Sequence, residues 1–321
     1  MKQAIRLVAV LAAAACALAS LAQGKDPAEV LKDIAALRTK RASEAREANK
    51  PLDVNGLNAE IKAMALEATA GVDPAKVDAA QAYDWAQVFS YAGKHKETCD
   101  LCAKFVASNP APERKFSAQM LMLTSCNELG EGEMILMALP DVVLPNWSAS
   151  QQLLRATLSQ YAGTILVDKG LDAALKAIDD VASRVQYESP EDYANRVFAA
   201  TKARNPKNPD GTPQTDEQIR ATLLTQGKGI NDSLKFSVVS KKASLLSEGG
   251  RKSTAVALLD SYIAEVGADS AYGKRASTTR TQLTIVGAVA PELVYDRKIG
   301  EFPGLQAWRG KVVIVDFTAH W

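Results

Sequence analysis

The feature that most constrains this chain is the spacing of its apolar residues, which recur three and four positions apart through most of its length. Val30, Ile34 and Leu37 form one such series, and Ala86 and Phe89 belong to another. This spacing places the apolar side chains on one face of an α-helix. The pattern therefore predicts a mainly α fold, in which each helix must pack on its neighbours to bury that face.

Glycine turns join several of these helical segments into pairs. Residues 165–178 turn at Lys169-Gly170, and residues 234–263 turn at Gly249-Gly250. A third pair turns at Gly93. Glycine is favoured where a helix stops and the backbone reverses, because it reaches left-handed conformations without a steric penalty. The chain is thus expected to contain successive helical hairpins.

The stretch from Gly93 to Pro110 resembles the second half of a tetratricopeptide repeat, with the turn glycine and the closing proline at the right spacing. Trp85 and Val88 lie on the preceding helix, where that repeat has its anchors. The resemblance implies a helical-repeat (TPR-like) domain over 23–285, with a Pro-rich loop at 203–216. Arrays of this kind present a surface that binds a protein partner.

Residues 1–22 have the layout of a signal peptide, with positive charges before an apolar run at 7–18 that is too short to span a bilayer. We expect cleavage before Gln23 and export to the periplasm or another extracytoplasmic compartment. Cys16 lies in a loose lipoprotein box, so lipidation of Cys16 is the alternative. Membrane attachment is expected only by that route.

Residues 286–321 follow a different pattern. Ala290-Pro291 interrupts the helical spacing, and the β-branched run at 311–317 predicts a buried strand. A strand that is apolar on both faces needs cover on both sides, as in an α/β sheet. Such a sheet cannot close within this stretch, so we expect the incomplete start of an α/β domain, with its other elements after Trp321.

The tail also resembles the exported TlpA/ResA-type thiol-disulfide oxidoreductases of the thioredoxin superfamily, through Ala290-Pro291, Leu305, 309–313 and 315–321. The resemblance implies a thioredoxin-like domain that acts on protein thiols or disulfides without a cofactor. Asp316 would be its buried acid, which is otherwise an ordinary Asp at the end of a strand. Trp321 would flank a nucleophilic cysteine of a Cys-x-x-Cys that follows it. Without those cysteines, we expect the fragment to be inactive.

Three further cysteines lie in the helical region, where an exported protein can form disulfides. Cys99 and Cys102 form a Cys-x-x-Cys, but inside a predicted helix, whereas redox motifs normally open one. They are either redox or structural thiols, or simply small buried side chains. Cys126 can approach them from the next helix. A zinc site with His95 lacks a convincing fourth ligand, so no metal is expected.

The charge distribution excludes one class of partner. The formal net charge is +1, and no block of Lys and Arg occurs. Nucleic-acid binders need a concentrated basic surface, so no nucleic-acid partner is expected. Two functional hypotheses remain. The first is an extracytoplasmic thiol-disulfide oxidoreductase with a helical docking domain, and the second is a non-enzymatic helical-repeat adaptor.

Overall fold

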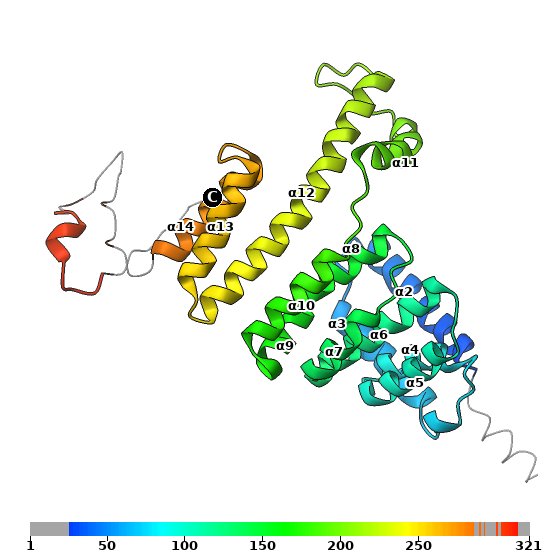
Figure 1. Ribbon diagram of the computed structural model, residues 1–321. Helices are drawn as coiled ribbons and strands as arrows, with labels where there is room; N and C mark the ends of the chain where they lie inside the picture. Colours follow the sequence, from blue (N-terminus) through cyan, green and yellow to red (C-terminus); the bar gives the residue numbers. More distant parts are fainter. Residues whose placement is uncertain (1–25, 286–288, 290–291, 293–299, 301–302, 314–321) are drawn as a thin grey trace, which may run out of the picture. The chain divides into compact units, whose positions relative to one another are not determined.

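The computed structural model describes residues 26–285, 289, 292, 300 and 303–313, and these residues are mainly helical (Figure 1). The predicted signal peptide at 1–22, with Cys16, lies outside them. None of the helices in the described part of the chain combines the length and the apolar character needed to cross a bilayer.

The chain divides into two compact units, 1–234 and 235–321, with the division inside one long helix. This division falls within the region that the sequence pattern assigns to a single helical-repeat domain. Unit 1 contains α2 (Pro27–Glu47), α3 (Val54–Ala68), η1 (Pro74–Lys76), α4 (Ala82–Tyr91), α5 (His95–Ala107), α6 (Pro112–Leu129), α7 (Gly132–Ala138), η2 (Leu139–Asp141), α8 (Trp147–Ala156), η3 (Thr157–Tyr161), α9 (Ala162–Lys169), α10 (Leu171–Ser183) and α11 (Pro190–Ala203). Helix α12 (Asp216–Glu248) runs into unit 2, which also contains α13 (Lys252–Val266), α14 (Ala271–Ile285) and η4 (Leu305–Trp308).

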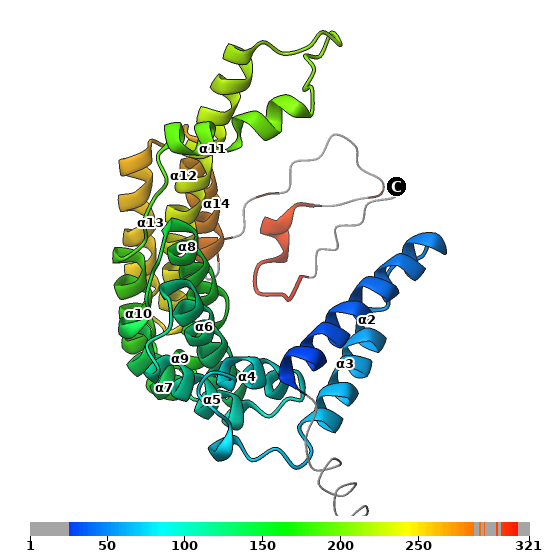
Figure 2. The same ribbon diagram turned by 90° about the vertical axis from the view of Figure 1, so that its right-hand side faces the viewer.

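Unit 1 is built from helical hairpins (Figures 1 and 2). Helix α4 packs on α5, α5 on α6, α6 on α7, and α9 on α10. The turns fall where the sequence predicts them, at Gly93 with φ 76° and at Gly170 with φ 86°. Both angles lie in the region that side-chain-bearing residues avoid, so a glycine at each turn allows the reversal without strain.

The predicted apolar stripes form the core at the start of unit 1. Val30 and Ile34 of α2 are buried, and so are Trp85 and Phe89 of α4 and Leu101 of α5. The rings of Trp85 and Phe89 meet edge to face, with centroids 6.2 Å apart. Since each helix buries its stripe against its neighbours, these helices stabilise one another.

The Pro-rich break lies between α11 and α12, as predicted. An isolated antiparallel bridge joins Lys207 to Pro213 within it. Next to the break, Ala194 of α11 packs against Ile219 and Leu223 of α12 in a small separate core.

Unit 2 contains the remaining predicted hairpin, formed by the end of α12 and α13 around Gly250, which has φ 77°. The ring of Phe236 packs between those of Tyr262 and Tyr272, at centroid distances of 6.0 and 5.7 Å. These contacts join α12, α13 and α14. Helix α14 is described as far as Ile285, where the continuous described stretch of the chain stops.

The tail is described only in part. The Glu292 carboxylate accepts hydrogen bonds from the backbone N–H groups of Leu305 and Gln306 at the start of η4, at 2.9 and 2.8 Å. Of the strand predicted at 311–317, only 311–313 belong to the described residues, and they form no strand. The part of the chain that the structure describes contains no strand; its one ladder contact is the Lys207–Pro213 bridge.

Candidate functional site

Two adjoining cavities, of about 360 and 510 Å³, lie across α4, α6 and α8 of unit 1. They share Met120, Thr124 and Gln152, so together they form one groove, called the α4–α6–α8 groove below. Its polar lining consists of amides and hydroxyls, with one arginine: Tyr83, Gln87, Ser90, Tyr91, Ser117, Thr124, Ser148, Gln151, Gln152, Arg155, Ser159, Gln160 and Tyr161.

Helical spacing brings these side chains together. On α4, the lining residues Tyr83, Gln87 and Ser90 are four and three positions apart, which places them on one face. Trp85 and Val88, on the other face of the same helix, are buried in the core. Helix α4 therefore turns a polar face to the groove, whereas α6 contributes Ser117 and Thr124 beside the apolar Phe116, Met120 and Leu121.

The first cavity of the groove has no charged side chain in its lining. Guanidinium groups lie at the rings that border it, with Arg38 5.0 Å from the Tyr91 ring centroid and Arg114 5.9 Å from that of Tyr83. The second cavity has one charged lining residue, Arg155. This lining suits a ligand that exchanges neutral hydrogen bonds and offers apolar groups to aromatic rings.

Gln151 is the exceptional residue of the groove. Its side-chain nitrogen is buried and has no hydrogen-bond partner. A buried donor without a partner destabilises the folded state by about 1–3 kcal/mol. Such groups are rare in folded proteins, and many of them occur where a ligand binds or a functional role requires them. The chain also passes through the π-helical segment η3 at this end of the groove, where the Tyr161 and Thr124 hydroxyl oxygens lie 3.3 Å apart. Such segments often occur at functional sites.

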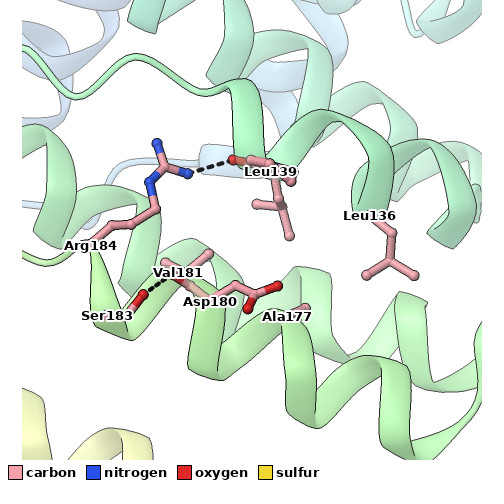
Figure 3. A pocket seen from close by; sticks show the side chains of 8 residues that line it. Leu136, Leu139, Ala177, Asp180, Val181, Ser183 and Arg184 are labelled. Carbon is pink, nitrogen blue, oxygen red and sulfur yellow. Dashed lines mark hydrogen bonds between the residues drawn. The ribbon is translucent and has the colours of Figure 1, made fainter.

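A smaller pocket of about 260 Å³ lies between α7, η2 and α10 (Figure 3). Arg184 donates to the carbonyl oxygen of Leu139 at 2.8 Å and also to that of Val142. Leu136, Leu139 and Val181 line the apolar side (Figure 3). Because the Arg184 guanidinium is already hydrogen-bonded to backbone carbonyls, we assign it a role in fixing η2 against α10.

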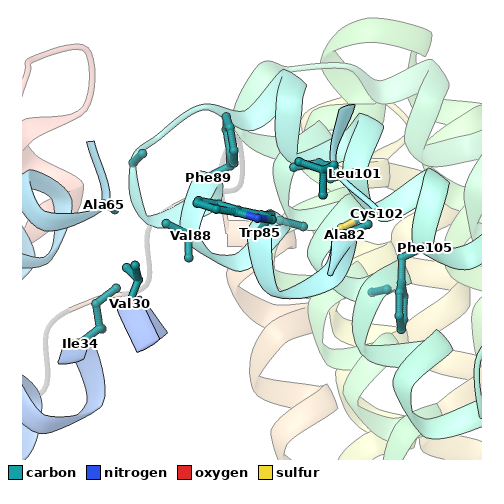
Figure 4. Packing of buried hydrophobic residues seen from close by; sticks show 14 of the residues in the cluster. Val30, Ile34, Ala65, Ala82, Trp85, Val88, Phe89, Leu101, Cys102 and Phe105 are labelled. Atoms are coloured by element: carbon teal, nitrogen blue, oxygen red, sulfur yellow. The ribbon is translucent and has the colours of Figure 1, made fainter. Parts of the chain in front are cut away.

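The cysteines of the helical region lie on two neighbouring helices. Cys99 and Cys102 are inside α5, and Cys102 is fully buried in the core beside Leu101 and Phe105 (Figure 4). Cys99 is half-buried, and its sulfur lies 3.6 Å from the sulfur of Cys126 on α6. The structure thus brings Cys99 together with Cys126.

The surroundings of the three thiols give them different pKa values. Burial, with a smaller contribution from Cys126, raises the pKa of Cys102 to about 12, so this thiol stays protonated. Cys99 and Cys126 share a hydrogen bond, and the S–H of Cys99 lowers the pKa of Cys126 by stabilising its thiolate. The same bond raises the pKa of Cys99. This hydrogen bond therefore favours ionisation of Cys126 over ionisation of Cys99.

Most of the remaining predicted residues fall outside the described part of the chain. Asp316, Trp321 and Cys16 lie outside the described residues. His95 begins α5, and its Nδ1 is buried without a partner. Among the described residues, no group of three or more His, Cys, Asp or Glu side chains is arranged to hold a metal ion.

No family model, curated protein or solved structure matches the chain.

The α4–α6–α8 groove was not predicted from the sequence. The available signal was a polar series opposite the apolar stripe, such as Ser148, Gln152 and Arg155 at helical spacing on α8.

Proposed function

We propose that the helical region is a docking module that binds an extended, uncharged segment of a partner polypeptide in the α4–α6–α8 groove. The observation that carries this proposal is the series of amides and hydroxyls that α4, α6 and α8 contribute to one groove. A peptide backbone offers one N–H donor and one C=O acceptor at each residue. The amide of Gln87 or Gln152 also has a donor and an acceptor, so either side chain can pair with a backbone unit in both directions.

Gln151 supports the same partner. Its unpaired nitrogen lacks an acceptor, and a peptide carbonyl is an acceptor of the right kind. If the Gln151 side chain rotates toward the groove on binding, its unpaired nitrogen can donate a hydrogen bond to a carbonyl of the peptide. The first cavity has no charged lining residue to pair with a desolvated phosphate or carboxylate, so this part of the groove suits an uncharged segment.

The test is selection of a phage-displayed library of random linear peptides on the protein, followed by fluorescence anisotropy with the enriched peptides. We expect the Gln87→Ala and Gln152→Ala variants each to weaken binding by about tenfold, the effect of about 1–1.5 kcal/mol in lost hydrogen bonds. The Gln282→Ala variant, in an exposed position on α14, is the matched control and should bind like the wild type. No enriched peptide, or equal binding by all variants, would refute the proposal.

A second function is favoured by the tail. We propose that the docking module serves an exported thiol-disulfide oxidoreductase of the TlpA type, with Asp316 as the buried acid behind its disulfide. The support is the resemblance of residues 309–313 and 315–321 to that family. Catalysis would proceed by thiolate attack on a substrate disulfide through a mixed disulfide.

This second proposal predicts that the coding sequence places Cys-x-x-Cys directly after Trp321. The product of the full coding sequence should then reduce insulin disulfides in the presence of dithiothreitol, and Cys-to-Ala changes in that motif should abolish the activity. A coding sequence without the motif would rule out the enzyme and leave the docking module as an adaptor.

A further inference from the structure

The Cys99–Cys126 pair lies outside the α4–α6–α8 groove and is independent of both proposed functions. Cys99 is in the second turn of α5 and Cys126 in the last turn of α6, 27 residues further along the chain. The two helices form a closely packed hairpin, so these positions face each other near one end of it. Among the described residues, Cys99 and Cys126 are the pair of cysteines whose sulfur atoms share a hydrogen bond.

The contact distance suits bond formation. Sulfur atoms 3.6 Å apart must approach by about 1.6 Å to reach the disulfide bond length. Rotation of the two side chains provides part of this approach, and a small shift of α5 against α6 provides the remainder. Cys102 is the poorer partner for Cys99, because it lies on the same helix and its side chain is enclosed in the apolar core.

Accessibility gives the two cysteines different roles. Cys99 is half-buried and can meet a reagent, whereas Cys126 is only 1% exposed. A reagent in solution therefore meets Cys99 before Cys126. An accessible attacking thiol beside a shielded second thiol is the arrangement that resolves a mixed disulfide within the protein.

We propose that Cys99 and Cys126 are a redox site that forms a reversible disulfide by exchange with a low-molecular-weight disulfide. Cys99 attacks one sulfur of the reagent, whose S–S bond breaks and releases the first thiolate. The proton of Cys99 passes to Cys126 along their hydrogen bond. Cys126 then gives up this proton and attacks the Cys99 sulfur, and the second thiolate leaves.

The exchange is balanced. One S–S bond breaks in the reagent and one forms between Cys99 and Cys126. Two electrons and two protons move from the protein to the reagent, which becomes two thiols. The proton released when Cys126 first ionises protonates the first leaving thiolate, and the proton carried by Cys126 protonates the second.

The test uses oxidised glutathione as the probe, followed by alkylation without reduction, trypsin digestion and mass spectrometry. Trypsin is expected to release Cys99 and Cys102 together in peptide 97–104, and Cys126 in peptide 116–155. The Cys102→Ala variant makes the first peptide specific for Cys99. We expect these two peptides to be joined in the wild type and in Cys102→Ala, and separate in Cys99→Ala.

Three results would overturn the proposal. They are stable glutathione on Cys99 without a cross-link, a bond between Cys99 and Cys102, or an undiminished cross-link in Cys99→Ala. Where a variant fails to fold, fragmentation of the wild-type cross-linked peptide between Asp100 and Leu101 still shows which cysteine carries the bond.

Discussion

Oxidation of the Cys99–Cys126 pair is expected to stabilise unit 1 by an amount that follows from the chain length between the cysteines. Their separation is 27 residues. A cross-link that closes a loop of this length removes unfolded-state entropy worth about 3.5 kcal/mol at room temperature. The approach of the two sulfurs costs part of this gain through strain in the hairpin. We therefore expect a net stabilisation of about 2–3 kcal/mol.

Equilibrium urea unfolding of the Cys102→Ala variant, monitored by far-ultraviolet circular dichroism, measures this gain. The oxidised form should unfold at a midpoint about 1 M higher than the form kept reduced, for a denaturant slope of about 2–3 kcal/mol/M. The same variant with Cys99→Ala added is the control, and its midpoint should not depend on the redox conditions. An oxidised form that unfolds at the same or a lower urea concentration would refute the assumption that α5 and α6 are already placed for the bond.

Three further predictions concern unit 1. The buried Gln119 side chain donates to the Asp141 carbonyl at 2.8 Å and accepts from the Val143 N–H at 2.9 Å. Gln119→Leu leaves both backbone groups unpaired and should lower the free energy of unfolding in urea by about 2–4 kcal/mol. An unchanged urea midpoint would contradict this prediction. Burial raises the pKa of Cys102 to about 12 in the folded protein, whereas the value in the unfolded chain is near 9. The stability that the protonated Cys102 thiol contributes is therefore complete below pH 9 and is lost as the pH rises toward 12. Under reducing conditions the wild type should lose about 1.4 kcal/mol more than Cys102→Ala between pH 8 and pH 10, and equal losses would argue against the raised pKa. Gln151→Leu should raise the stability of the free protein by about 1 kcal/mol and weaken the binding of a selected peptide, whereas a clear loss of stability would show that its amide is paired.

Local sequence signals predicted the helices and their turns because the physical causes are local. Trp85 and Phe89 share a face through helical spacing alone, and Gly93, Gly170 and Gly250 take left-handed angles that favour glycine at a reversal. The Pro-rich break between α11 and α12 is equally local. Each of these features is determined by fewer than about ten neighbouring residues.

The groove and the thiol pair are determined by packing between helices, which the sequence does not display. Gln87 and Gln152 line the same cavity only because α4 and α8 pack on either side of α6 with these side chains toward one another. The sequence places Cys126 on the helix after Cys99, but the 3.6 Å contact depends on how α5 and α6 align. The unpaired nitrogen of Gln151 likewise results from the way α8 is buried.

The docking account is tested most directly by hydrogen–deuterium exchange of the protein with and without a selected peptide. Binding in the groove should slow amide exchange in α4, α6 and α8, because a bound partner suppresses the opening of the helices that it contacts. Exchange in α13 and α14 should be unchanged. Protection confined to α13 and α14, or no protection by a peptide shown to bind, would contradict the central claim that the α4–α6–α8 groove is the binding site.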